Sequence, residues 1–125
     1  QRLVRKLCSN CKKTRKIEED ELKKIKDVMV PVKEKLGVPD LNTSLKIAVP
    51  GKCKECNEAG YKGRTGVFEA FTMSREIEKL ILKSPAISDV RDLAVAEGMI
   101  TMLQDAYLKL IDGVTSMEEI ERVLG

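Results

Sequence analysis

Two cysteine pairs with the same spacing constrain this chain more than any other feature. Cys8 and Cys11 form one C-x-x-C pair, Cys53 and Cys56 form the other, and there is no further cysteine. A gap of two residues lets both sulfurs of a pair turn inward at one tight knuckle, so two knuckles place four sulfurs at the corners of a tetrahedron. The pattern predicts a tetracysteine site that binds one structural zinc ion.

The two pairs are far apart in the sequence, with residues 12–52 between them. A compact zinc ribbon has roughly 15–20 residues there, so we expect an inserted helix to fill the excess. Two disulfides, buried free thiols, a thioredoxin-like redox pair and an iron–sulfur centre remain as alternatives. Two matched pairs favour a metal over each of these.

The residues give no sign of catalysis. Four thiolates leave no open coordination position and the chain has no histidine, so the metal should hold structure and not activate water. There is no G-x-S-x-G elbow, no G-x-x-x-x-G-K-[ST] phosphate loop and no G-x-G-x-x-G motif. We therefore expect no catalytic residue and no nucleotide site in this chain.

Charge and hydropathy fit a small protein with a modest core. The chain has 23 basic and 20 acidic residues, and its net charge of +3 is weak evidence for binding of nucleic acid. No apolar run approaches the length of about 20 residues that crosses a bilayer. We expect no direct insertion into a membrane.

The first part of the chain, residues 1–72, mixes helix and strand signals. The spacing of Leu3, Val4 and Leu7 predicts a short helix at the start. An apolar stripe over 18–29 predicts a second helix, and we expect the charged stretch 18–35 that contains it to lie as an arm over the zinc knuckles. Alternation over 45–49 predicts a strand, and the glycine-rich segment 60–71 predicts a tight turn that runs into another strand.

The second part, residues 73–125, reads as four short helices. They are expected over 75–83, from Pro85 to the residues before Gly98, after Thr101, and after Thr115 or Ser116, with serine or threonine as the N-cap of each. Gln104 completes a capping box with Thr101, and a glutamate, Glu118 or Glu119, does so for the last helix. The predicted fold class is α+β. A small tetracysteine zinc subdomain with short strands and an inserted helix is followed by a small all-α helical bundle.

Four blocks of this sequence, at 1–12, 53–69, 98–106 and 113–120, together resemble the C-terminal zinc-binding and helical region of the type II secretion and type IV pilus assembly ATPases. The blocks include Gln-Arg-Leu-Val-Arg-Lys-Leu-Cys-Ser-Asn-Cys-Lys and Gly-Tyr-Lys-Gly-Arg-Thr-Gly-Val-Phe-Glu. The resemblance covers nearly the whole chain, and only the segment from about Thr14 to Ala48 departs freely from it.

The resemblance implies a parent enzyme that forms a cytoplasmic hexamer, hydrolyses ATP and works on an inner-membrane platform protein. It implies that Cys8, Cys11, Cys53 and Cys56 hold structural Zn²⁺ beside a RecA-like ATPase core. ATP and Mg²⁺ would bind only in that core, upstream of Gln1, because the Walker motifs are absent here. The parent would be peripheral to the inner membrane through its partners, and neither nucleic-acid binding nor ATP turnover by this chain alone is expected.

Our hypothesis is that this region is a non-catalytic, rigid handle. It would transmit ATP-driven domain motion to neighbouring subunits and to the platform protein, through a basic surface that includes Lys12, Lys13 and Lys62. Arg64 either reaches across a subunit boundary or bonds within its own domain. The alternative is a zinc-ribbon module that binds nucleic acid. The sequence leaves the choice between secretion and pilus assembly open.

Overall fold

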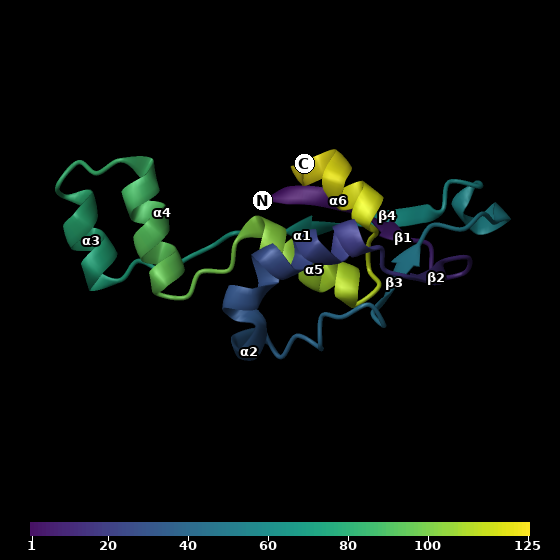
Figure 1. The fold of residues 1–125 in the computed structure, drawn as a ribbon. Helices are drawn as coiled ribbons and strands as arrows, with labels where there is room; N and C mark the ends of the chain where they lie inside the picture. The colour runs from purple at the N-terminus through teal and green to yellow at the C-terminus, as the bar shows by residue number, and fades with distance from the viewer.

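The computed structural model describes all residues, 1–125, and has the α+β class expected (Figure 1). Its elements in chain order are β1 (Arg2–Leu7), β2 (Lys13–Lys16), α1 (Glu19–Met29), η1 (Val30–Val32), α2 (Lys33–Leu36), β3 (Lys46–Val49), η2 (Lys54–Cys56), β4 (Tyr61–Val67), α3 (Arg75–Ile81), α4 (Ile87–Ala96), α5 (Met102–Ile111) and α6 (Met117–Leu124).

The strands form two separate antiparallel pairs. β1 pairs with β4, with Arg2 opposite Val67 and Arg5 opposite Arg64. β2 pairs with β3, with Lys13 opposite Val49. Strand β3 was predicted, whereas β2 was not, because Lys13–Lys16 is largely exposed and shows no alternation of apolar and polar residues.

The prediction of a helix at the start of the chain is wrong, because Arg2–Leu7 is strand β1. Val4 and Leu7 are both buried although they are three residues apart, a spacing that also fits a helix. The register of the β1–β4 pair shifts between Arg5 and Leu7, where two steps along β1 correspond to three along β4, from Arg64 to Tyr61. The extra residue of this β-bulge is therefore in β4.

The main core lies between the β1–β4 pair and helices α1, α5 and α6. Its fully buried members include Val4 and Val67 from the strands, Ile25 from α1, Leu110 from α5 and Ile120 from α6. In Figure 1, α1 and α5 lie beside each other, and α6 lies next to β1. Residues from both ends of the chain therefore share one core.

The expectation that the helix over 18–29 lies over the zinc knuckles is wrong. Helix α1 instead packs on α5, where Ile25 and Met29 are fully buried and the Gln104 side chain donates a hydrogen bond of 3.1 Å to the Val28 carbonyl. An apolar stripe needs an apolar partner surface. Helix α5 provides one through Ala106 and Leu110.

Helices α3 and α4 form a small lobe of their own, at the left of Figure 1. Three buried residues, Ile77, Ala94 and Met99, make up its core. The lobe joins the rest of the chain through two extended segments, which form a β-bridge between Ala70 and Ile100. A domain boundary between residues 72 and 73 stays a prediction, and the main core takes residues from both sides of it.

Helix starts follow the capping signals in part. Thr101 caps α5 with the reciprocal Gln104 contact that was predicted, Ser74 caps α3, and Ser116 caps α6. Ser84 does not cap α4, which begins two residues later than expected, after Ala86, whose N–H donates to the Asp89 carboxylate. No helix has the length and apolarity that crossing a membrane requires.

Candidate metal centre

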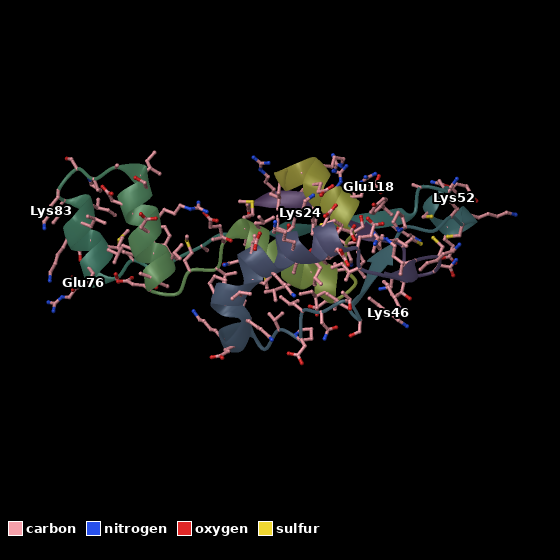
Figure 2. The ribbon with its side chains drawn as sticks, in the orientation of Figure 1. Lys24, Lys46, Lys52, Glu76, Lys83 and Glu118 are labelled. Atoms are coloured by element: carbon pink, nitrogen blue, oxygen red, sulfur yellow. The ribbon has the colours of Figure 1, made fainter.

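The four cysteine sulfurs come together at the end of the molecule farthest from the α3–α4 lobe, where Figure 2 shows yellow sulfur atoms near Lys52. One knuckle follows β1, and the other is the short helix η2, which follows β3. Their four sulfur atoms all lie within 4.8 Å of one another. The structure thus brings together all four residues that the sequence predicted as metal ligands.

The sulfur spacing fits a single tetrahedral ion. The distances are 3.8 Å from Cys8 Sγ to Cys53 Sγ, 3.7 Å from Cys11 Sγ to Cys56 Sγ, and 3.6 Å from Cys53 Sγ to Cys56 Sγ. A tetrahedron with metal–sulfur bonds of about 2.3 Å has edges of about 3.8 Å. The donor set and its dimensions therefore match those of a structural zinc site.

The same distances argue against disulfides. A disulfide joins sulfurs at about 2.05 Å, and none of the four cysteines is so bonded. A cluster with several irons would bind different sulfurs to different metal atoms, which spreads the sulfurs farther apart. The geometry favours one ion among four thiolates.

The backbone around the knuckles leaves no room for larger residues. A Cβ atom on Gly51 would lie 1.9 Å from the Cys11 carbonyl oxygen, so only glycine lets the two knuckles approach this closely. Gly60 has a φ of +77°, and its N–H donates to Cys56 Sγ at 3.2 Å. That N–H provides the hydrogen-bond support that metal-bound sulfurs need.

The protein environment shifts the pKa values of two of the thiols in opposite directions. Burial, reinforced by hydrogen bonds with the neighbouring sulfurs, raises the pKa of Cys11 to about 12. A hydrogen bond from the side chain of Asn10 lowers the pKa of Cys53 to about 6. Sequence reasoning missed Asn10, since an exposed asparagine inside a knuckle looks like an ordinary turn residue.

We expect zinc affinity to fall steeply as the pH is lowered from 7 to 5. Zinc binds thiolates, so protons compete with the ion at every sulfur, and Cys11 must lose a strongly held proton when the ion binds. Competition with a zinc-binding dye at several pH values would measure this dependence. An affinity that stays constant over this range would contradict thiolate ligation.

The four-cysteine cluster is attached directly to the main core. Lys12, next to the first knuckle, donates a hydrogen bond of 2.9 Å to the Gly113 carbonyl in the α5–α6 turn. The Leu7 N–H donates to the Val114 carbonyl, also at 2.9 Å. These contacts hold the knuckles against the turn between the last two helices. The sequence suggested that Lys12 is a free charge on a basic surface, but its ammonium group is bound to the Gly113 carbonyl.

A second polar cluster joins β1, β4 and α6 around Glu119, whose side chain is fully buried. Arg5 donates to this carboxylate from its backbone N–H and from its guanidinium, and the Arg122 guanidinium donates to both oxygens. The Arg5 guanidinium also stacks at 4.2 Å on the Tyr61 ring, and the Tyr61 hydroxyl lies 2.7 Å from Ser116 Oγ. Burial alone would raise the pKa of Glu119, but these arginine hydrogen bonds lower it to about 2.

From the sequence, Glu119 was expected to complete a capping box with Ser116, because it stands three residues after Ser116. Its N–H does donate to Ser116 Oγ at 3.2 Å. Its carboxylate, however, bonds to arginines from two elements and not to the helix end. A glutamate between the apolar residues Met117 and Ile120 of an amphipathic helix was the available signal that this side chain is buried.

Comparisons with known proteins give the family of this chain. The family described as "Type II/IV secretion system protein" matches residues 1–122 of the chain. The chain belongs to this family. Among its relatives, the type IV pilus assembly ATPase PilB of Acinetobacter baylyi is 34% identical over 98% of the chain, and the type II secretion system protein HxcR of Pseudomonas aeruginosa is 42% identical over 57%.

A further member of the family, the type II secretion system protein E of Dickeya dadantii, is 28% identical over 98% of the chain. The chain spans only about a fifth of the length of these relatives, 20% of the PilB protein, 15% of HxcR and 22% of protein E. The type II/IV secretion family membership confirms the resemblance seen in the sequence. We therefore assign the activity of the complete relatives to this chain only as a proposal.

Proposed function

We propose that this chain is the tetracysteine and helical region of a secretion or pilus assembly ATPase, and that Cys8, Cys11, Cys53 and Cys56 hold one structural Zn²⁺ there. The observation that carries the proposal is the gathering of all four sulfurs within 4.8 Å, from two knuckles far apart in the sequence. When bound, zinc would supply a crosslink between the knuckles and no catalytic step, because four thiolates fill its coordination sphere. ATP and Mg²⁺ would bind in the ATPase core of the complete protein.

We propose further that the region transmits ATP-driven domain motion as one rigid body. The knuckles are hydrogen-bonded to the α5–α6 turn, and α6 is held to β1 by the buried Glu119 cluster. A movement imposed on the β1–β4 strands is therefore passed to the knuckles without an intervening flexible segment. This stiffness suits a rigid element that passes motion from the ATPase core of a cytoplasmic hexamer to an inner-membrane platform protein.

The surface that would contact the platform protein lies at the free end of the knuckles. Lys13, Lys52, Lys54 and Lys62 are exposed there, and none of them has an ion-pair partner within the chain (Figure 2 labels Lys52). Acidic residues are fewer at this end, with Glu55 and Glu58 beside the second knuckle. We therefore expect a partner surface with acidic character.

The double substitution Lys13→Glu with Lys62→Glu in the full-length ATPase should weaken binding to the cytoplasmic part of the platform protein by about tenfold or more, since like charges would then face each other. Neither residue is a zinc ligand, so zinc content and the thermal midpoint of unfolding should not change. Binding is measured by surface-immobilised pull-down or calorimetry at low and moderate salt.

Lys83→Glu on the α3–α4 lobe is the matched control, because Lys83 is equally exposed and also lacks an ion pair (Figure 2). Platform binding that survives the double substitution, or that falls equally with the Lys83 variant, would overturn the proposed contact. The nucleic-acid alternative has little support, since the aromatic side chain nearest the knuckles, Tyr61, is engaged by Arg5 and Ser116 and is not free to stack on a base.

A further inference from the structure

The α3–α4 lobe, which takes no part in the function proposed above, has an apolar core separate from the main core. Its buried residues, Ile77, Ala94 and Met99, pack with Val90 and Leu93 of the same lobe. The residues of the main core all come from outside the segment 68–101. Apolar packing therefore holds each of the two bodies together but does not join them. Figure 1 shows the lobe set apart, with two thin segments leading to it.

The segment that enters the lobe is fixed to helix α5 before the lobe begins. The Phe68 N–H donates to the Asp105 carboxylate at 2.8 Å, and the Met102 N–H donates to the Glu69 carboxylate at 2.9 Å. Met102 is the first residue of α5, so the Glu69 carboxylate lies at a helix N-terminus, where the helix dipole favours a negative charge. Glu69 is therefore anchored to the main core.

One side chain of the lobe reaches Glu69. The Arg91 guanidinium, from the middle of α4, donates to both carboxylate oxygens of Glu69, at 2.8 and 3.4 Å. The two segments that connect the bodies meet at the β-bridge between Ala70 and Ile100. Glu69 stands on the main-core side of this bridge and Arg91 on the lobe side. The ion pair therefore spans the point about which the lobe would turn.

A second polar contact also joins the lobe to the main core. The Lys35 ammonium donates to the Gly98 carbonyl at 2.8 Å. Gly98 is only two residues from Ile100 of the bridge, so this contact acts close to the turning point and restrains a rotation little. Within the lobe, Ser74 Oγ donates to the Glu97 carboxylate at 2.9 Å and so joins the two ends of the lobe. The lobe can therefore move as one body.

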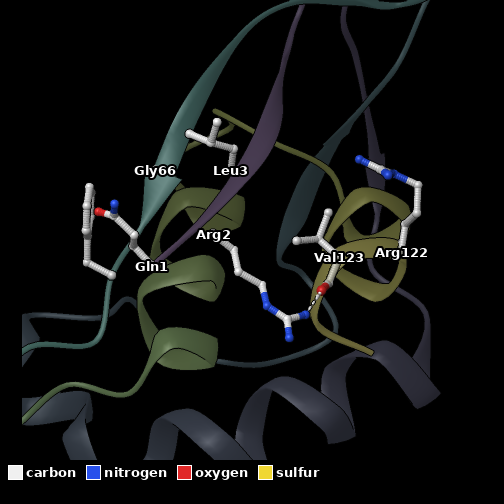
Figure 3. A pocket seen from close by; sticks show the side chains of 7 residues that line it. Gln1, Arg2, Leu3, Gly66, Arg122 and Val123 are labelled. Carbon is white, nitrogen blue, oxygen red and sulfur yellow. Dashed lines mark hydrogen bonds between the residues drawn. The ribbon is translucent and has the colours of Figure 1, made fainter.

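The ion pair also borders a groove between the two bodies. The groove has a volume of about 630 Å³, and Arg91 is its only lining residue from the lobe, whereas Val28 and Met102 are among those from the main core. Arg2 lines the groove as well and is fixed in place, because its guanidinium donates to the Val123 carbonyl of α6 (Figure 3). The width of the groove therefore depends on where Arg91 lies.

We propose that the Glu69–Arg91 ion pair is a latch, and that breaking it lets the α3–α4 lobe turn about the Ala70–Ile100 bridge and opens the groove. The side chains of Arg91 and Glu69 are 53% and 22% exposed. An ion pair this accessible shifts an equilibrium by at most about fivefold, because water and salt compete with it. The latched and released orientations are therefore close in free energy, and a ligand that binds either side chain selects between them.

Nuclear magnetic resonance of the 14.0 kDa chain measures the orientation of the lobe directly. In the wild type, residual dipolar couplings of the backbone N–H groups of the lobe and of the main core should fit a single alignment tensor. In Arg91→Gln they should require two tensors, with the alignment of the lobe reduced at least about twofold relative to that of the core. Glu69→Gln should act in the same direction, and the double substitution should add little to either, because all three remove one contact.

Glu76→Gln is the matched control. Glu76 pairs with Lys79 inside α3, so its substitution changes the charge of the lobe but not the connection to the core (Figure 2 labels Glu76). This variant should keep the single tensor. Amide chemical shifts of the buried Ala94 and Met99 verify that the lobe of each variant is folded.

Because Arg91 and Glu69 belong to different bodies, a folding defect in one variant leaves the other as the test. The proposal is overturned if the wild type already requires two tensors, or if the folded Arg91 and Glu69 variants keep a single one. An effect of Glu76→Gln as large as that of Arg91→Gln would also overturn it, since the lobe would then respond to its charge and not to the latch.

Discussion

Replacing Cys53 with serine should abolish stable zinc binding and unfold the two knuckles while leaving the helical core in place. A structural zinc ion with four thiolates contributes on the order of 10 kcal/mol of folding free energy to the segment that it crosslinks, and a serine hydroxyl is a poor ligand for it. The knuckles have few other means of support, because none of the four cysteines belongs to the main core.

The measurement combines elemental analysis with hydrogen exchange in the purified protein. We expect about one zinc per wild-type chain and almost none in the variant, with fast amide exchange around Cys8 to Lys12 and Lys52 to Gly60. The far-ultraviolet circular dichroism of the helices should change little. Removing zinc from the wild type with a chelator should reproduce this pattern.

Ser9→Ala is the matched control, because Ser9 lies inside the first knuckle, is exposed and is not a ligand. It should retain the full zinc content. A Cys53→Ser variant that keeps one tightly bound zinc, or a wild type that purifies under reducing conditions without metal, would refute the structural zinc site.

Glu119→Gln should destabilise the fold by about 3 kcal/mol at neutral pH. The Glu119 pKa of about 2 lies well below the ordinary value of 4.5, and that difference is worth about 3 kcal/mol for a carboxylate with no exposed surface. The amide also leaves Arg5 and Arg122 beside each other without their shared counter-charge. Urea denaturation monitored by circular dichroism would measure the loss.

The low pKa of Glu119 also predicts that the free energy of unfolding depends on pH in the acid range. Its pKa is lower in the folded than in the unfolded chain, so its contribution is fully present above about pH 4.5 and is lost as the pH falls toward 2. The Gln variant should lack this part of the dependence. Glu121→Gln is the control, because Glu121 forms an exposed ion pair with Lys24, which is worth at most about 1 kcal/mol. Equal effects of the two substitutions would contradict the role of the buried cluster.

The sequence predicted best where local rules decide the outcome. The equal spacing of the cysteine pairs, the capping box at Thr101 and the apolar stripe over Glu19–Met29 are each contained in a few neighbouring residues, and the structure has the expected element or cluster at each place. The α+β class followed from the order of these signals.

The errors arose where distant residues decide the outcome. Arg2–Leu7 has a spacing that suits a helix, and only its pairing with β4, some sixty residues later, makes it a strand. The partner of α1 could not be read from its own stripe, because α5 lies much farther along the sequence than either knuckle. The Glu119 carboxylate binds Arg122, three residues away on α6, and also Arg5 at the other end of the chain, and no local pattern contains this second contact.

The β-bridge between Ala70 and Ile100 places the entry and the exit of the α3–α4 lobe side by side. A segment whose two ends meet in this way can be lengthened, shortened or exchanged without moving the residues on either side of it. A change in the length of this lobe would therefore leave strand β4 and helix α5 in their places.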